Sequence, residues 1–314
     1  MQLVSEAPLI LATASGKGGV GKSLLTTNLA LFAAKQGKRV VIVDADFGGA
    51  NVHNFLGLSY PTVTLNDFLS KRVSTLSKTA LPAIFPGFWL ISGDRSSFEL
   101  ANLPYQQKLK LLRHLKQLPV DYVFLDLGAG SAFNTLDFYN AADVQLLVTT
   151  PTQMSIDNMY HFLKTAIYRS LKQGLKNSAS VCQKRVLQAL DNSARFGSKS
   201  FVEALIDVSS EEDAIDWSPV FRILDQMQPQ IIMNQVTSEK TLKLGPQISL
   251  ACEQYFGIQT SYIGFLPKSK EAEQSVLKRA PVVVDSPDSA FVHELQTIYL
   301  QLQNFAHTVP RKKL

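Results

Sequence analysis

A glycine-rich loop with two lysines, placed between an apolar run and a helix, constrains the fold of this chain most strongly. Residues 15–23 read SGKGGVGKS and directly follow the apolar run at residues 9–14. They fit the pattern G-x-x-x-x-G-K-[ST] in the strand, loop, helix context that the pattern requires. Glycines let backbone N–H groups turn inward around phosphate oxygens, and the helix adds the positive end of its dipole. The sequence therefore predicts a phosphate-binding loop in an α/β fold.

Short apolar runs alternate with segments of helical periodicity along most of the chain. The apolar runs lie at residues 9–14, 40–44, 89–92, 122–126, 144–149, 231–234 and 262–264. The helical segments lie at residues 23–35, 106–118, 155–171, 242–256 and 289–305. Such alternation builds right-handed crossovers between parallel strands. We expect a single P-loop NTPase domain over residues 1–314, with a twisted, mostly parallel sheet and helices on both faces.

Residues 172–228 interrupt this alternation with a long stretch that contains Gly174, Gly197 and an acidic turn at residues 211–213. Apolar runs before and after the stretch both look fully buried, which favours an insertion within one domain over a separate domain. We expect a helical insertion that forms a hairpin on the surface.

Three side chains outside the glycine loop complete the predicted phosphate chemistry. Asp126 ends the run YVFLD, which is typical of a Walker B strand whose carboxylate holds Mg²⁺ through water. Asp44 and Asp46 end the run VVIVDAD, where a carboxylate can orient an attacking water or help to hold the metal. Alone, this pair could equally cap a turn. In the loop itself, Lys22 is expected on the β- and γ-phosphates and the Ser23 hydroxyl on Mg²⁺.

Composition is consistent with a globular protein of the cytoplasm. Hydrophobic residues make up 46% of the chain, and no apolar run approaches the ~18 residues of a membrane span. Its two cysteines, Cys182 and Cys252, are too few for a disulfide framework and are not spaced as a metal or redox motif. We therefore expect a reducing compartment and a cytoplasmic location.

The extra lysine in the loop, Lys17, makes the sequence resemble the MinD/ParA class of P-loop ATPases, whose deviant Walker A motif is K-G-G-x-G-K-[ST]. The similarity continues through GKRV at residues 37–40, DAD at residues 44–46, ANV at residues 50–52, LGL at residues 56–58 and LDLGAG at residues 125–130. These segments together are most similar to the MinD-like branch that includes FlhG, also called FleN or YlxH, a regulator of flagellar number and placement.

This resemblance implies a symmetric homodimer that encloses ATP and Mg²⁺, with Lys17 reaching the phosphates of the partner. It implies catalytic roles for Lys17, Lys22 and Asp46, and Mg²⁺ ligands at Ser23, Asp44 and Asp126. Adenine would contact Asn234 and the turn that ends at Pro267, although a strand-end cap and an ordinary turn would explain these two residues as well. The residues implied to bind ATP are Gly16, Lys17, Gly18, Gly19, Val20, Gly21, Lys22, Ser23, Leu24, Asn234 and Pro267.

Two departures from the branch bear on regulation. FlhG relatives carry a glutamate and an aspartate where this chain has Thr152 and Asn158, so carboxylates expected near the dimer seam are replaced by neutral side chains, with only Asp157 nearby. The resemblance also implies an N-terminal extension that engages a GTPase partner, and this chain has few residues before its first apolar run. We therefore expect altered coupling of dimerisation to hydrolysis, and no partner of that type through that route.

Positive charge gathers in one segment. Residues 158–202 hold eight basic residues and one acidic residue, a net charge of +7, whereas the whole chain carries +5. Clustered lysine and arginine on helices attract DNA backbones or anionic headgroups, although a solvated helical face is the plainer interpretation. The candidate contacts are Lys164, Arg169, Lys172, Lys176, Lys184 and Arg185. We expect the helix at residues 289–305 to dock on the sheet and the basic residues 311–313 to be at most a weak membrane aid.

Three functions remain open at this stage. The first is an ATP-dependent dimerisation switch with slow hydrolysis, which positions or regulates a cellular structure such as the flagellum through a protein activator or effector. It would act in the cytoplasm, at the inner face of the membrane or at a cell pole. The second is a ParA-like segregation ATPase that holds DNA nonspecifically through the basic segment. The third, an electron-transfer or iron–sulfur ATPase, is disfavoured because paired cysteines are missing.

Overall fold

The central strands of the sheet are buried on both faces, which explains their unbroken apolar runs. In β1 (Leu9–Ala14), Ile10 and Ala12 contact one hydrophobic core, and Leu9 and Leu11 contact the other. The computed structural model describes residues 7–47, 49–93, 103–175, 185, 186, 188, 200–211, 217–309, 311 and 312.

Eight strands in the described part of the chain form one sheet, in the order β3-β4-β2-β5-β1-β6-β7-β8. All neighbouring pairs are parallel except β3 and β4, which are antiparallel. The strands after β1 are β2 (Val40–Ala45), β3 (Ala80–Pro82), β4 (Phe88–Ile91), β5 (Tyr122–Leu127), β6 (Val144–Thr149), β7 (Gln230–Val236) and β8 (Ser261–Pro267). The predicted fold class, an α/β domain with a mostly parallel sheet, is confirmed. The edge strand β3 was not predicted.

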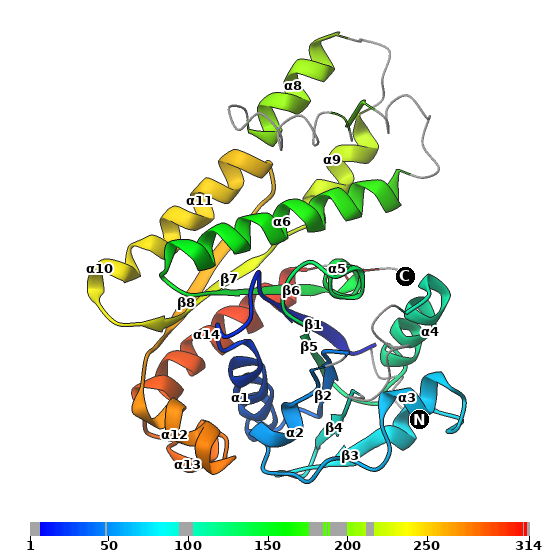
Figure 1. Ribbon diagram of the computed structural model, residues 1–314, viewed down its shortest axis with the longest axis vertical. Helices are drawn as coiled ribbons and strands as arrows, with labels where there is room; N and C mark the ends of the chain where they lie inside the picture. The colour runs from blue at the N-terminus through cyan, green and yellow to red at the C-terminus, as the bar shows by residue number, and fades with distance from the viewer. Residues whose placement is uncertain are drawn as a thin grey trace.

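Helices cover both faces of this sheet (Figure 1). One face carries α1 (Lys22–Lys35), α2 (Val52–Phe55), α12 (Lys270–Lys278), α13 (Val282–Asp285) and α14 (Ala290–Thr308). The other face carries α3 (Leu65–Leu69), α4 (Tyr105–Leu115), α5 (Phe133–Ala141), α6 (Gln153–Gly174), α8 (Phe201–Glu211), α9 (Ser218–Asp225) and α11 (Leu244–Phe256). Two short helices, η1 (Leu76–Thr79) and α10 (Glu239–Leu242), lie in connections. The helix predicted at residues 289–305 docks on the sheet as α14, as expected.

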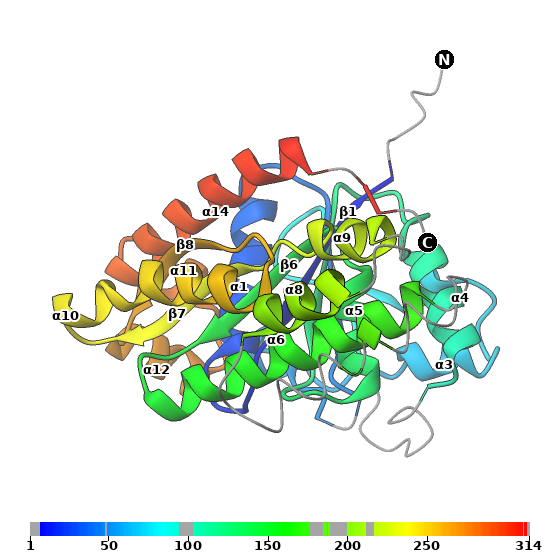
Figure 2. The ribbon, with the colours of Figure 1, turned by 90° about the horizontal axis from the view of Figure 1, so that it is seen from above.

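The described helices of the segment predicted as a helical insertion, α8 and α9, lie at the surface and pack inward through one face each. The predicted start of the segment, Lys172, lies inside α6, which continues to Gly174 without interruption. Val220 and Leu224 of α9 are buried in the same core as the inward face of α6, and Phe201 of α8 joins that core. Figure 2 shows α8, α9 and α11 along the outer side of α6. Sequence periodicity locates helices here, but it does not show which of them bury a face.

None of the helices in the described residues is long and apolar enough to cross a membrane.

Candidate functional site

The glycine loop turns from β1 into α1 at the carboxyl edge of the sheet. Gly19 and Gly21 have φ angles of 78° and 84°, a left-handed conformation that glycine adopts without a steric cost. Gly21 then precedes the first residue of α1. A Cβ atom on Gly18 or Gly19 would meet no heavy atom within 4 Å, so open space lies beside the loop at these two positions. This is the predicted strand, loop, helix geometry of an anion-binding site.

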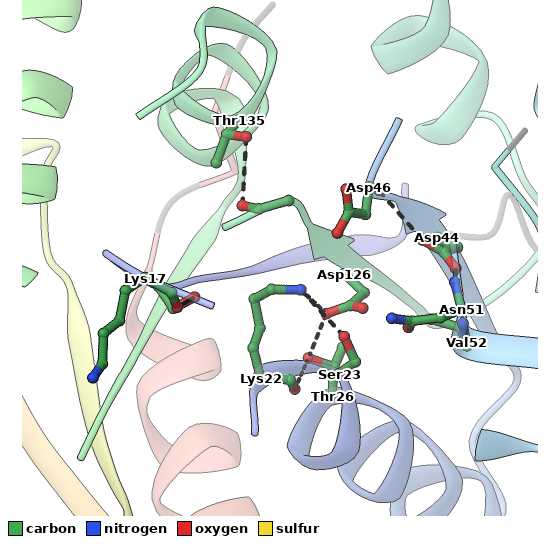
Figure 3. Close-up of polar contacts among 12 residues, drawn as sticks. Lys17, Lys22, Ser23, Thr26, Asp44, Asp46, Asn51, Val52, Asp126 and Thr135 are labelled. Carbon is green, nitrogen blue, oxygen red and sulfur yellow. Dashed lines mark hydrogen bonds and ion pairs between the residues drawn. The ribbon is translucent and has the colours of Figure 1, made fainter. Parts of the chain in front are cut away.

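Lys22 lies inside this site and pairs with the aspartate at the end of β5. Its Nζ donates to Asp126 Oδ1 at 2.7 Å and to Ser23 Oγ at 3.3 Å, and both Lys22 and Asp126 are buried (Figure 3). Thr26 Oγ1 also donates to Asp126 Oδ1, at 3.3 Å. A buried ion pair of this kind holds the lysine at the mouth of the loop, where anionic oxygens would be bound.

Asp44 caps a turn, which is the alternative that the sequence left open for it. Its Oδ2 accepts hydrogen bonds from the N–H groups of Asn51 and Val52, at 2.7 and 2.8 Å, at the start of α2. Its Oδ1 accepts from the N–H of Asp46 at 3.3 Å. Burial, helped by the neighbouring charge of Asp126, raises the pKa of Asp44 to about 7.

Asp46 projects from the end of β2 into the space between the strands (Figure 3). Partial burial raises the pKa of its carboxyl above the ordinary value, although the charge of Lys22 opposes this shift. A Cβ atom on Gly128 would lie 3.1 Å from Asp46 Oδ1, so the glycine after β5 leaves room for this carboxylate. Asp46 is thus the most accessible of the three carboxylates, as a group that acts on a bound water must be.

Oxygen donors suited to Mg²⁺ are present beside the loop. Asp126 Oδ2 is buried and has no hydrogen-bond partner among the described residues, and the Ser23 hydroxyl lies next to the same lysine. Mg²⁺ prefers carboxylate and hydroxyl oxygens and keeps several of its waters. The donor set of Ser23 and Asp126 therefore fits this ion. Asp44 differs from this donor set, because both of its carboxylate oxygens already accept hydrogen bonds from backbone N–H groups.

Lys17 lies apart from Lys22. Its side chain points away from the cluster of Lys22 and Asp126 (Figure 3), and within the described residues its Nζ takes part in no hydrogen bond or ion pair. Its own carbonyl accepts a hydrogen bond from Ser15 Oγ at 3.0 Å, which fixes the backbone at this point of the loop. The two lysines of the loop are therefore separated, one inside the site and one outside it.

The end of β7 contacts the loop from the other side. Asn234 Nδ2 donates to the Val20 carbonyl at 2.7 Å, and Gln235 Nε2 donates to the Gly19 carbonyl at 3.2 Å. The strand-end role that the sequence allowed for Asn234 is thus what the contacts show. Gln235 was not predicted, and only its place directly after Asn234 could have pointed to it. Pro267, predicted at the same end of the site, pairs with Val236 at the end of β8.

Arg169, predicted as a polyanion contact, is engaged in an ion pair within the protein. Its Nε and Nη2 donate to the two oxygens of Asp137 at 2.7 and 2.9 Å, and Lys108 Nζ reaches Asp137 Oδ2 at 2.7 Å. Gln173 donates to the same carboxylate, at 2.8 Å. This cluster joins α4, α5 and α6. Lys172 of the predicted set stacks over the Tyr168 ring at 5.8 Å, and Lys176 and Lys184 lie outside the described residues.

Lys312 of the basic terminal residues is tied to the protein. Its backbone N–H donates to Asp143 Oδ1 at 2.8 Å and its Nζ donates to the Asn140 carbonyl at 3.0 Å. Lys116 Nζ in turn donates to the Lys312 carbonyl. Asp143 also accepts from the N–H of Ile10 at 2.9 Å, so Lys312 docks at the amino ends of β1 and β6, opposite the phosphate loop. Of the basic residues 311–313, expected to be at most a weak membrane aid, Lys312 is thus held by the fold and Arg311 is exposed, and Lys313 lies outside the described residues.

At the predicted dimer seam, Thr152 and Asn158 lie at the start of α6. Thr152 precedes the first residue of the helix and is exposed, and Asn158 Nδ2 donates to the Met154 carbonyl at 2.7 Å. Asp157, the carboxylate nearby, accepts from Gln153 at 2.8 Å.

Comparisons with known proteins agree with this geometry. The family model described as "ParA: NUBPL iron-transfer P-loop NTPase" matches residues 7–168. The chain is 33% identical to the flagellum site-determining protein YlxH of Helicobacter pylori over 156 residues. This aligned region covers 49% of this chain and 52% of YlxH. It is 32% identical to the antiactivator FleN of Pseudomonas aeruginosa over 166 residues. This aligned region covers 52% of this chain and 58% of FleN. The chain thus spans little more than half of these relatives.

Among solved structures, MinD of Pyrococcus horikoshii in complex with Mg-ADP superposes with a TM-score of 0.65 at 17% identity, over 98% of this chain and 100% of that one. A glycine loop between β1 and α1, a lysine and an aspartate paired at 2.7 Å and a mostly parallel sheet define a P-loop NTPase. With the matched family model, the second lysine of the loop narrows the assignment: the chain belongs to the ParA/MinD family of P-loop NTPases.

Proposed function

We propose that the protein binds ATP with Mg²⁺, hydrolyses it slowly and, in the ATP state, forms a homodimer that positions or regulates a cellular structure. The observation that carries the proposal is the separation of the two loop lysines. Lys22 is paired inside its own site, whereas Lys17 points away from it and makes no side-chain hydrogen bond or ion pair in the described part of the chain. A cation directed outward beside a phosphate loop is suited to the phosphates of a second subunit.

Each residue has a distinct role in this proposal. The loop N–H groups and Lys22 bind the phosphates, and Lys17 of the partner neutralises charge that develops on the transferred phosphoryl group. Hydrolysis then depends on dimerisation. Asp46, whose pKa is raised by burial, orients the attacking water and accepts its proton more readily than an ordinary carboxylate would. Ser23 and Asp126 would hold Mg²⁺, which would neutralise charge on the β- and γ-phosphates.

The cellular part of the proposal rests on the relatives. YlxH is a flagellum site-determining protein and FleN is an antiactivator, and a septum site-determining MinD of Synechocystis is 32% identical over 148 residues. We propose a cytoplasmic protein that acts at the inner face of the membrane or at a pole, through a protein activator or effector that recognises one of its two states. Iron transfer is not part of the proposal, because the sequence contains no C-x-x-C pair.

Mass measurement in solution tests the switch. With ATP, Asp46→Ala is expected to run as a dimer because its ATP is not consumed, and Lys17→Ala is expected to bind ATP but stay monomeric. Lys22→Ala serves as the control without nucleotide, after a check that it still unfolds cooperatively. A monomeric Asp46→Ala protein at saturating ATP would rule out the switch.

A pulldown then identifies the partner class. Proteins that co-purify with ATP-loaded Asp46→Ala but not with Lys22→Ala are candidate effectors. Retention of DNA by the same sample, with a steep loss as salt rises, would instead support the segregation function. The engagement of Arg169 by Asp137 counts against that second function.

A further inference from the structure

Five carbonyl groups of the phosphate loop accept hydrogen bonds from protein donors. Gly130 N donates to Ser15 O at 2.9 Å, and Ser15 Oγ donates to Lys17 O at 3.0 Å. Further along the loop, Leu25 N donates to Gly21 O at 3.0 Å. The carbonyls of Gly19 and Val20, just before Gly21, accept from the side chains at the end of β7 rather than from the backbone.

The amide groups of the loop are left without partners. Within the described part of the chain, the N–H groups of Gly18, Gly19 and Gly21 donate to no protein acceptor. A peptide group has its N–H and its carbonyl on opposite sides, because the unit is planar and trans. A donor that holds the carbonyl on one side of the loop therefore directs the N–H of the next residue to the other side. Holding the Gly19 carbonyl therefore directs the N–H of Val20, and holding the Val20 carbonyl directs the N–H of Gly21.

A bulge at the end of β7 places two amide side chains for this purpose. Met233 pairs with Phe265 and Val236 pairs with Pro267, so two residues of β7, Asn234 and Gln235, lie opposite one residue of β8. Gln235 has a φ angle of 60°, a left-handed conformation that costs a non-glycine residue on the order of 1 kcal/mol. Its N–H donates to Asn234 Oδ1 at 2.8 Å, which holds the bulge in this shape.

Close packing fixes the position of the first amide. A Cβ atom on Gly21 would overlap Asn234 Nδ2, so the last loop glycine is required by the approach of this side chain as well as by its own φ angle of 84°. Asn234 is buried, and Gln235 is exposed beside it. The Gln235 side chain is therefore held by its contact with Gly19 and not by surrounding core residues.

We propose that Gln235 is a positioning residue of the phosphate loop, which together with Asn234 holds the Gly19 and Val20 carbonyls outward so that the following N–H groups face the bound phosphates. Its effect on phosphate binding rests on the proposed nucleotide site, whereas its effect on the loop itself does not. The contact with the Gly19 carbonyl explains why a glutamine, rather than a glycine, holds the left-handed backbone conformation at position 235.

Three variants separate the amide from the backbone. Gln235→Glu keeps the shape but replaces the donor with an acceptor. Gln235→Gly keeps the left-handed backbone at no steric cost and lacks the side chain. Gln235→Lys restores a donor. Gln296→Glu, an exposed position on α14, is the matched control for the change of charge.

Backbone NMR order parameters of residues 18–21 without nucleotide are the first measurement, and binding of ADP by calorimetry is the second. We expect lower order parameters in the loop of Gln235→Glu and Gln235→Gly, and ADP affinity about three- to tenfold weaker, as for the loss of one neutral hydrogen bond. Gln235→Lys and Gln296→Glu should behave as the parent protein in both measurements, and thermal unfolding without nucleotide should change little in all four variants.

Unchanged order parameters in residues 18–21 of both Gln235→Glu and Gln235→Gly would overturn the proposal. Lower order parameters in these variants together with an unchanged ADP affinity would overturn the role in phosphate binding. The NMR measurement needs no nucleotide, so it decides the role of Gln235 in the loop even where the proposed ATPase function fails and the parent protein binds no ADP.

Discussion

Gly16 of the phosphate loop packs directly on the backbone of Asn158 in the second turn of α6. A Cβ atom on Gly16 would overlap the Asn158 carbonyl, and it would lie 2.6 Å from the N–H nitrogen of Met159. The start of α6 is itself fixed to β6, because Ser155 Oγ accepts from the N–H of Thr150 at 3.0 Å. The loop that carries Lys17 and the helix at the predicted dimer seam therefore share one close contact.

Gly16→Ala is expected to disturb this contact. The added methyl group must displace backbone rather than a flexible side chain, which costs about 1–3 kcal/mol of unfolding free energy. Chemical denaturation without nucleotide measures this loss. Gly18→Ala is the matched control, since its methyl group would meet no atom within 4 Å. Equal stability of the two variants would show that α6 yields freely at Asn158.

Asp137 holds three helices together, and Asp137→Asn is expected to lower the unfolding free energy by about 3–5 kcal/mol. The loss is large because Lys108 is buried and would keep its charge beside Arg169 without a counter-ion. The exposed pair at Asp157 offers the control, Asp157→Asn, with an expected change below about 0.5 kcal/mol. Urea unfolding at neutral pH compares the two variants.

The contribution of Asp137 to the unfolding free energy is expected to depend on pH in the acid range. Burial raises the pKa of Asp137, but hydrogen bonds from Arg169 and Lys108 outweigh burial and hold the pKa below its ordinary value. A depressed folded pKa contributes stability above the unfolded value near 3.8, and that stability is lost as the pH falls through the folded pKa. The difference in stability between the parent protein and Asp137→Asn should therefore shrink below about pH 4. A difference that stays constant down to pH 2 would contradict this assignment.

The sequence was sufficient for the parts of the molecule that local patterns define. The glycine loop, the buried strands and the position of Asp126 at the end of β5 follow from short motifs and apolar runs. The partners of Arg169 do not, because Asp137 and Lys108 come from helices 32 and 61 positions away in the chain, and no local pattern joins them. Gln235 escaped notice for a similar reason, since a β-bulge is set by the pairing of β7 with β8.

Two exposed apolar side chains, at the starts of α5 and α6, offer a test of the dimer face. Phe133 begins α5 and Met154 lies in the first turn of α6, with 59% and 67% of their surfaces exposed. Large apolar groups at the centre of an interface often dominate its affinity. Met154→Lys is expected to weaken the ATP-dependent dimer at least about tenfold while ADP binding stays unchanged. Leu300→Lys on α14, half exposed on the other face of the sheet, should leave the dimer intact in sedimentation measurements.

Titration of Lys312 is expected to make the unfolding free energy depend on pH in the alkaline range. Burial, with the charge of Lys116 in the same direction, lowers the pKa of its ammonium group to about 8, although Asp143 opposes the shift. Between pH 8 and the unfolded value of 10.5, the unfolded chain binds a proton that the folded protein does not, so folding becomes more favourable as the pH rises. Neutral Lys312 Nζ can still donate to the Asn140 carbonyl, which keeps the docked geometry.

Lys312→Met removes this titration and keeps the backbone contact with Asp143. The unfolding free energy of the parent protein, measured relative to the variant, should therefore rise by on the order of 1–2 kcal/mol between pH 7.5 and 10, since partial exposure of the lysine reduces the full effect. Because both proteins share every other titrating group, their difference isolates the lysine. A difference that falls with rising pH would mean that Lys312 is docked as a cation, with Asp143 as the dominant partner.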